Sequence, residues 1–157
     1  MSKFVPMRPR QAHKATLSFA IVASQYNAQY TQALVDNAYR ELNVLEPGAG
    51  VSLFSPPGSF EIPLMVQMLA ETERYQAIIA LGVLLQGETA HAALVAQCVT
   101  NALMDISLAN RIPVIHGVLF LENDEQARAR CVEPEFNRGV EAARAAVAAA
   151  RALRDIK

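Results

Sequence analysis

Residues 77–91 read AIIALGVLLQGETAH and hold the clearest structural signal in the chain. The segment 77–85 is uninterrupted apolar sequence with β-branched members, a pattern typical of a strand that is buried on both faces of a sheet. Polar residues follow at once, and the Gly-x-Thr step that ends at Thr89 can turn the chain into a helix that runs from about Ala90 to Ala109. The stretch therefore predicts a central strand that leads directly into a helix.

The turn between this strand and this helix has the features of an anion site. We expect the backbone N–H groups from Gly87 to Thr89 to bind a phosphate or carboxylate at the positive end of the helix dipole. Glu88 is expected to lie in the first helical turn, where an acid favours the dipole. His91 follows two residues after Thr89, so its imidazole could exchange protons with a bound anion. Spacing alone leaves open whether this histidine is catalytic or structural.

Composition limits the classes of function. The 157 residues suit one compact domain, and a net charge of −1 with 18% charged residues gives no basic field for nucleic acid. No apolar run reaches the roughly 20 residues of a membrane span, and the N-terminus lacks a signal-peptide core, so we expect a cytoplasmic protein. Cys98 and Cys131 are too isolated to predict a disulfide framework or a metal site.

Strand and helix patterns alternate along the rest of the chain. Three further strands are predicted at 16–23, 51–54 and 112–119, and residues 1–15 are predicted as an extended arm before a single domain over 16–157. The predicted helices follow the first strand, with a face of Leu34, Ala38, Leu42 and Leu45, then begin near Pro63 and cover 124–130 and 137–154. Such alternation predicts an α/β fold with a four-stranded parallel sheet covered by helices on both faces.

In sheets of this kind, ligands bind beyond the carboxyl ends of the strands. Polar and aromatic segments follow the predicted strands at 24–27, 57–61, 86–91 and 120–123. His116 is expected near the end of the fourth strand. The candidate site residues therefore converge on one edge of the predicted sheet.

Six ordered motifs match one family. They are Tyr26-Asn27, PGSFEIP at 57–63, GETAH at 87–91, PVIHGVL at 113–119, EQA at 125–127 and NRGVEAA at 137–143. From about Phe19 to Leu153 the chain resembles the 6,7-dimethyl-8-ribityllumazine synthase family, which makes the direct precursor of riboflavin. The resemblance implies a flavodoxin-like three-layer α/β/α sandwich.

The resemblance also implies a reaction. It is the condensation of 5-amino-6-(D-ribitylamino)uracil with 3,4-dihydroxy-2-butanone 4-phosphate, through a Schiff base, loss of phosphate and ring closure. No metal and no organic cofactor is implied. Glu88 and Thr89 would bind the phosphate-bearing ketone at the helix N-terminus, Arg130 would supply the positive charge, and His91 would transfer protons.

The aminouracil half of the site is implied in the same way. Tyr26 would stack on the pyrimidine ring, while backbone groups of Ser59 and Phe60 and the Glu61 carboxylate would hold the ribityl chain. A structural reading of Glu61, as a residue that starts a helix, stays open beside this one. Three residues at the strand end would lie along the heterocycle: Val83, Leu84 and Leu85.

The family implies pentamers in which neighbouring subunits share each site. His116 and Arg130 would then act across a subunit interface. His116 stands where the family usually has a phenylalanine, and Arg138 replaces a usual lysine. An imidazole is smaller and ionises near pH 6.5, so we expect a lower or pH-dependent affinity for the pyrimidine.

Three other functions fit parts of the pattern. One is a non-catalytic shell protein of the same fold that binds a lumazine or flavin, and another is an archaeal-type riboflavin synthase. The third is a flavin carrier, but the segment after the first strand, SQYN at 24–27, lacks the glycine and threonine of a phosphate loop. Mixing the protein with both synthase substrates would separate these functions.

Overall fold

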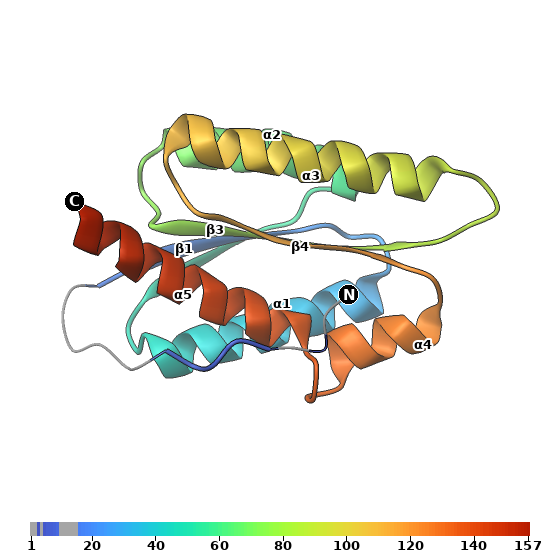
Figure 1. The fold of residues 1–157 in the computed structure, drawn as a ribbon, viewed down its shortest axis with the longest axis horizontal. Coiled ribbons are helices and arrows are strands. Elements are labelled where there is room, and N and C mark those ends of the chain that lie inside the picture. Colours follow the sequence, from blue (N-terminus) through green and yellow to red (C-terminus); the bar gives the residue numbers. More distant parts are fainter. Residues whose placement is uncertain (1–2, 4, 10–15) are drawn as a thin grey trace.

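The computed structural model describes residues 3, 5–9 and 16–157. The predicted arm over 1–15 therefore lies largely outside the described residues, and its separation from a domain over 16–157 stays a prediction. Within the described part, four parallel strands form one sheet in the order β2-β1-β3-β4 (Figure 1). The strands are β1 (Ser18–Ala23), β2 (Gly50–Phe54), β3 (Ala77–Leu85) and β4 (Val114–Leu121). The predicted α/β class and parallel sheet are confirmed.

Helices cover both faces of this sheet (Figure 1). One layer holds α1 (Ala28–Leu45), α4 (Asp124–Ala127), the π-helical turn η2 (Arg128–Val132) and α5 (Arg138–Ile156). The opposite layer holds α2 (Ile62–Glu71) and α3 (His91–Asn110), and the 3₁₀ turn η1 (Ser59–Glu61) leads into α2. The chain thus forms the three-layer sandwich of flavodoxin-like proteins.

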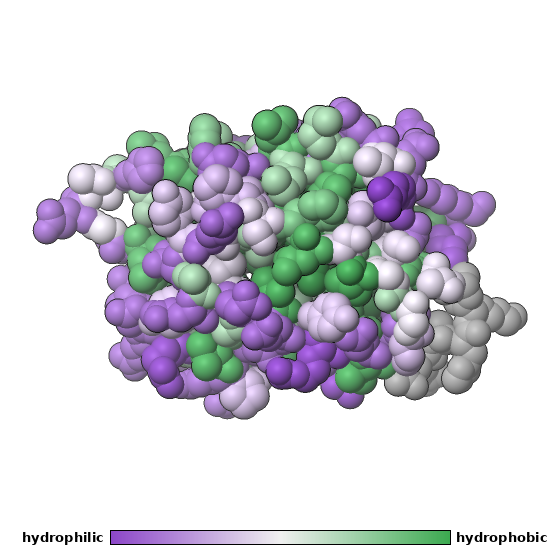
Figure 2. Space-filling model, turned by 180° about the vertical axis from the view of Figure 1, so that it is seen from behind, coloured by the Kyte–Doolittle hydropathy of each residue, from purple (hydrophilic) through white to green (hydrophobic). Residues whose placement is uncertain are grey.

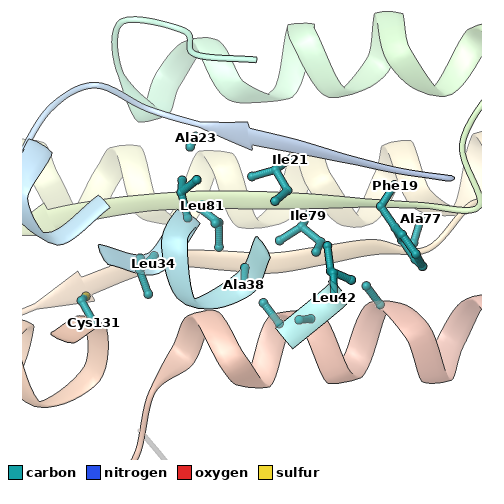
Figure 3. Close-up of a cluster of buried hydrophobic side chains, with 14 of the residues drawn as sticks. Phe19, Ile21, Ala23, Leu34, Ala38, Leu42, Ala77, Ile79, Leu81 and Cys131 are labelled. Atoms are coloured by element: carbon teal, nitrogen blue, oxygen red, sulfur yellow. The ribbon is translucent and has the colours of Figure 1, made fainter. Parts of the chain in front are cut away.

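The centre of the sheet is buried on both faces, as the apolar sequence of β3 predicts. Ile79 and Leu81 point into the core beneath α1 and α5, while Ile78 and Ala80 point into the core beneath α2 and α3. Figure 3 shows the first of these clusters, where side chains of β1 and β3 meet the apolar face of α1. That face is the predicted one: Leu34, Ala38, Leu42 and Leu45 are fully buried.

A glycine and a cap fix how α5 lies on α1. A Cβ at Gly139 would collide with the Leu34 carbonyl oxygen, so only glycine permits this close approach of the two helices. Asn137 caps α5, since its Oδ1 accepts from the N–H groups of Gly139 and Val140 at 3.0 and 3.1 Å. The start of α5 is therefore set by packing and capping together.

The fourth strand differs from the prediction. It begins at Val114 and not at Ile112, because the Ile112 N–H donates to the Ser107 carbonyl and closes the C-terminus of α3. It also continues to Leu121, whose carbonyl accepts from the Gln86 N–H. His116 is the third residue of β4, so the prediction that it lies near the strand's end is wrong.

Glu41 is a buried carboxylate on α1 that binds two arginines. Its side chain is 8% exposed and accepts from Arg8 Nε at 2.7 Å and from Arg144 Nε at 3.1 Å. Arg144 also donates to the Pro6 carbonyl, so the described segment 5–9 is tied to α1 and α5 through these contacts. Burial acts to raise the pKa of Glu41, but the two arginines outweigh burial and lower it below its ordinary value.

We expect Glu41→Gln to lower the free energy of unfolding at neutral pH by about 1–3 kcal/mol, because two charged donors lose the negative charge and one of the two acceptor oxygens of Glu41. A carboxylate with a lowered folded-state pKa stabilises the fold above its unfolded-state pKa, and this contribution is lost as the pH falls through the folded-state value. Melting curves of wild type and variant should therefore converge on acidification. Glu135→Gln, at an exposed carboxylate, is the matched control. A constant gap between wild type and Glu41→Gln at all pH values would contradict this account.

Candidate active site

The carboxyl ends of β1 and β3 form the point where the sheet reverses its winding. From β1 the chain crosses to β2 on one side, and from β3 it crosses to β4 on the other. In open parallel sheets the crevice at such a point binds ligands. The segments that follow β1 and β2 meet there, beside the end of β3.

Tyr26 and Glu61 approach each other around a glycine. A Cβ on Gly58 would lie 3.0 Å from the Tyr26 ring and 2.9 Å from the Glu61 carboxylate, so the missing side chain makes room for both. The Tyr26 side chain is 69% exposed and its ring is free to stack on a ligand. The structure therefore brings Tyr26 beside the Ser59–Glu61 turn, as expected for one binding surface.

The loop that carries Tyr26 is tied to both neighbouring segments. The Gln25 N–H donates to the Pro57 carbonyl at 3.1 Å. Asn27, in the left-handed conformation with φ 53°, donates from Nδ2 to the Val83 carbonyl at 2.7 Å. Asparagine tolerates this conformation better than most residues. These contacts position Tyr26 relative to the ends of β2 and β3.

The η1 turn presents two of its three residues to solvent. Phe60 is 62% exposed and Glu61 is exposed, while Ser59 is buried. The Glu61 Oε2 atom accepts from the Gly58 N–H at 3.0 Å, so Glu61 stabilises the start of this turn. Contact of the same carboxylate with a ligand stays a prediction. Pro63 lies in the first turn of α2, as predicted.

A second glycine accommodates two buried hydroxyls below this surface. A Cβ on Gly82 would lie 2.8 Å from Ser59 Oγ and 3.0 Å from Ser24 Oγ. Among the described residues, Ser24 Oγ is buried without a hydrogen-bond partner. Larger side chains at position 82 would displace Ser59, so β3 also determines where the η1 turn lies.

The three residues at the end of β3 differ in how far they are buried. Val83 is fully buried in the core beneath α1 and α5, so its side chain does not reach the crevice and its carbonyl is bonded to Asn27. Leu84 and Leu85 are half-buried. Their contact with a heterocycle stays a prediction, and for Val83 only a backbone contact fits this geometry.

Helix α3 starts within one residue of the predicted position, but Glu88 does not lie in its first turn as expected. The helix begins at His91, with Ala90 as N-cap, and its first turn contains no acidic residue. Glu88 and Thr89 lie in the preceding loop, because the Thr89 hydroxyl accepts from the His91 N–H at 3.3 Å and ends the loop there. The amides at the positive end of the dipole thus start at His91. Glu88, Thr89 and His91 are all exposed.

His116 lies away from this edge. It pairs in register with Ala80, and β3 runs five further residues to Leu85, which is roughly 16 Å at the rise of a strand. It lines a cavity of about 230 Å³ beside the open edge of β4, together with Arg138 and Glu141 of α5. One chain therefore does not bring His116 to His91.

Arg130 belongs to the η2 turn, in the layer opposite α3. Its guanidinium lies over the Phe136 ring, 5.5 Å from the centroid, a favourable cation–π distance. Arg138, Arg144 and Arg151 have acidic partners, whereas Arg130 forms no ion pair with any residue that the structure describes. Its charge is therefore available to an anion from outside this segment.

Comparison with known proteins gives the family. A model of the family described as 6,7-dimethyl-8-ribityllumazine synthase matches residues 16–154. The chain belongs to the lumazine synthase family. Curated members include synthase 1 of Caulobacter vibrioides, 38% identical over 88% of this chain and 91% of that protein. The Streptomyces coelicolor synthase is 41% identical over 89% and 87%, and the Coxiella burnetii synthase is 34% identical over 92% and 96%.

Three residues beside the predicted site residues were not themselves predicted as site residues: Asn27, Phe136 and Glu141. Asn27 could have been found, because it stands in one of the matching motifs and asparagine in a loop tolerates the left-handed conformation. Phe136 and Glu141 gave no local signal, since their positions depend on how η2 and α5 fold back on β4. In the described part of the chain no three His, Cys, Asp or Glu residues group as a metal site. Cys131 is a core residue, and burial raises the pKa of its thiol to about 12.

Proposed function

We propose that this chain condenses 5-amino-6-(D-ribitylamino)uracil with 3,4-dihydroxy-2-butanone 4-phosphate to 6,7-dimethyl-8-ribityllumazine, with release of phosphate and water. The approach of Tyr26 to the η1 turn beside the end of β3, in a member of the lumazine synthase family, carries this proposal. A non-catalytic shell protein is not favoured, because the curated relatives carry the name of the enzyme.

The crevice residues suit the aminouracil. The exposed Tyr26 ring would stack on the flat pyrimidine, a contact worth about 1 kcal/mol beyond its buried area. The polyol chain would lie along the η1 turn, where Ser59 and Phe60 offer backbone groups and Glu61 a carboxylate. Leu84 and Leu85 would cover the apolar side of the ring.

The ketone phosphate would bind at the start of α3. The first-turn amides carry partial positive charge, and Thr89 and the backbone of Glu88 lie directly before them. The uncommitted guanidinium of Arg130 would neutralise the phosphate. His91, the first residue of the helix, would transfer protons during Schiff-base formation, loss of phosphate and ring closure.

The two halves of this site face different sides of the chain. Tyr26, Ser59–Glu61 and His91 lie at the carboxyl ends of the strands, whereas His116 lines the cavity at the open edge of β4. A head-to-tail ring brings the first surface of one subunit against the second surface of the next. We therefore infer homopentamers with shared sites, as the family resemblance implies.

Exposed apolar residues support burial between subunits. Figure 2 shows apolar side chains gathered across the centre and upper part of the face on which α2 lies.

Helix α3 is also long and apolar enough to cross a membrane by length and composition alone. Its residues Val99, Leu103 and Ile106 pack in the core, so we infer a cytoplasmic protein whose outer helix faces contact other subunits. The large exposed apolar residues of the two helices are Leu64, Met68, Leu94, Met104 and Leu108.

The test is a direct assay with the purified protein. Both substrates are mixed with the full chain, and lumazine is followed by its absorbance and fluorescence. We expect turnover without added metal or cofactor. Binding of lumazine without turnover would instead support the shell protein, and conversion of lumazine to riboflavin would support a riboflavin synthase.

A further inference from the structure

The His116 imidazole is held at both ring nitrogens. The Val118 N–H donates to Nδ1 at 3.2 Å, and Nε2 lies 2.7 Å from the Thr100 hydroxyl oxygen. The Thr100 hydroxyl in turn donates to the Ala96 carbonyl at 2.7 Å. A strand residue is thus connected to the backbone of α3 by a continuous chain of hydrogen bonds.

Counting protons along this chain assigns the tautomer. The single Thr100 hydroxyl hydrogen is used by the Ala96 carbonyl, so the hydroxyl oxygen accepts from His116 and Nε2 carries a hydrogen. Nδ1 accepts from the Val118 amide and carries none. A second proton on Nδ1 would face that N–H and break the bond.

The surroundings do not favour a charged ring. Arg138 and Glu141 of α5 line the same cavity, but they form an ion pair with each other. The residues one turn from Thr100 on α3 are Ala96 and Met104, and the register partner on β3 is Ala80, none of which ionises. Although His116 is exposed in the single chain, desolvation of its ring by the packed neighbours lowers its pKa, which revises the expectation of ionisation near pH 6.5.

We propose that Thr100 is a positioning residue for substrate binding: with the Val118 amide it holds the His116 imidazole as the neutral Nε2–H tautomer in one orientation. This rests on the proposed function, in which His116 forms a wall of the neighbouring subunit's pyrimidine pocket. Both hydrogen bonds lie in the ring plane, so they prevent rotation and leave the ring face free for a flat, uncharged heterocycle. Thr100 itself need not contact the substrate.

Nitrogen NMR of the full assembled protein tests whether Thr100 fixes the tautomer of the His116 ring. The protein is labelled with ¹⁵N-histidine, and magic-angle-spinning spectra are recorded between about pH 5 and pH 8. His116→Phe identifies the His116 signals. We expect wild type and Thr100→Ser to show one protonated and one unprotonated nitrogen at the upper end of this pH range. Thr100→Val, which lacks the hydroxyl, should show mixed tautomers and a ring that titrates at higher pH.

Steady-state kinetics test the effect on substrate. Thr100→Val should raise KM for the aminouracil about two- to tenfold, the range of one neutral hydrogen bond, and leave KM for the ketone phosphate unchanged. Thr100→Ser should restore KM. In a His116→Phe background, which keeps a flat ring without nitrogens, Thr100→Val should have no further effect on KM. Melting temperatures check that each variant is folded.

Two results would overturn the proposal. One is a Thr100→Val variant whose His116 signals and KM match wild type. The other is an equal rise of KM for Thr100→Val with and without His116→Phe, because the effect would then not pass through the imidazole. A wild-type protein without turnover would instead overturn the proposed function and, with it, the role in substrate binding. The NMR spectra would still decide whether Thr100 holds the ring.

Discussion

The His91→Ala variant is expected to form lumazine with a kcat about 10- to 1000-fold below wild type. General acid–base assistance is typically worth ~10²–10⁴ in rate, and the amino and phosphate groups of the substrates can supply part of the proton transfer themselves. His91 is exposed at the first position of α3, so the fold should be unaffected. The measurement is kcat under saturation with both substrates.

His91→Asn is a useful companion, because an amide can form hydrogen bonds but cannot transfer protons near neutral pH. It should be as slow as His91→Ala, with both KM values close to wild type. Turnover at the wild-type rate in either variant would remove His91 from the mechanism.

The Arg130→Ala variant should raise KM for the ketone phosphate by about 10- to 150-fold and leave KM for the aminouracil unchanged. A charge-assisted contact of about 1.5–3 kcal/mol is lost, and no described residue competes for this guanidinium with an ion pair. Arg128→Ala, on the same η2 turn and exposed, is the matched control and should leave both KM values unchanged.

A rise in KM for the aminouracil instead would show that Arg130 is placed at the wrong half of the pocket. Arg130→Lys keeps the charge and loses the planar donor geometry, so an intermediate KM would indicate that both properties contribute.

The local sequence determines much of this fold. The apolar segment 77–85 is the central strand with its predicted bounds, and the apolar face of α1 is fully buried. Both signals depend on burial within one element, which a periodic pattern records directly. The convergence of Tyr26 with the η1 turn follows from the rule for the carboxyl ends of parallel strands.

The errors share a different cause. Glu88 lies outside the first turn of α3 because the His91 N–H donates to the Thr89 hydroxyl and ends the loop there, and β4 starts late because Ile112 closes the preceding helix. Caps of this kind compete with regular structure over one or two residues. The place of His116 depends on the register between β3 and β4, which no pattern within one strand encodes. Strand patterns alone therefore place His116 at the same edge as the other site residues, and only the family resemblance assigns it to a subunit interface.

The shared site is tested most directly by mixing the His91→Ala and Arg130→Ala variants and assaying at a ketone phosphate concentration far below the KM of Arg130→Ala, where each variant alone has little activity. His91→Ala subunits keep Arg130, and Arg130→Ala subunits keep His91, so a site is intact only where the second kind supplies the histidine and the first kind the arginine. After verified subunit exchange at a 1:1 ratio, about a quarter of the sites in a closed head-to-tail ring should be intact, and roughly a quarter of wild-type activity should return. Activity that stays at the level of the separate variants would mean that each site is built within one chain, and the shared-site account would be wrong.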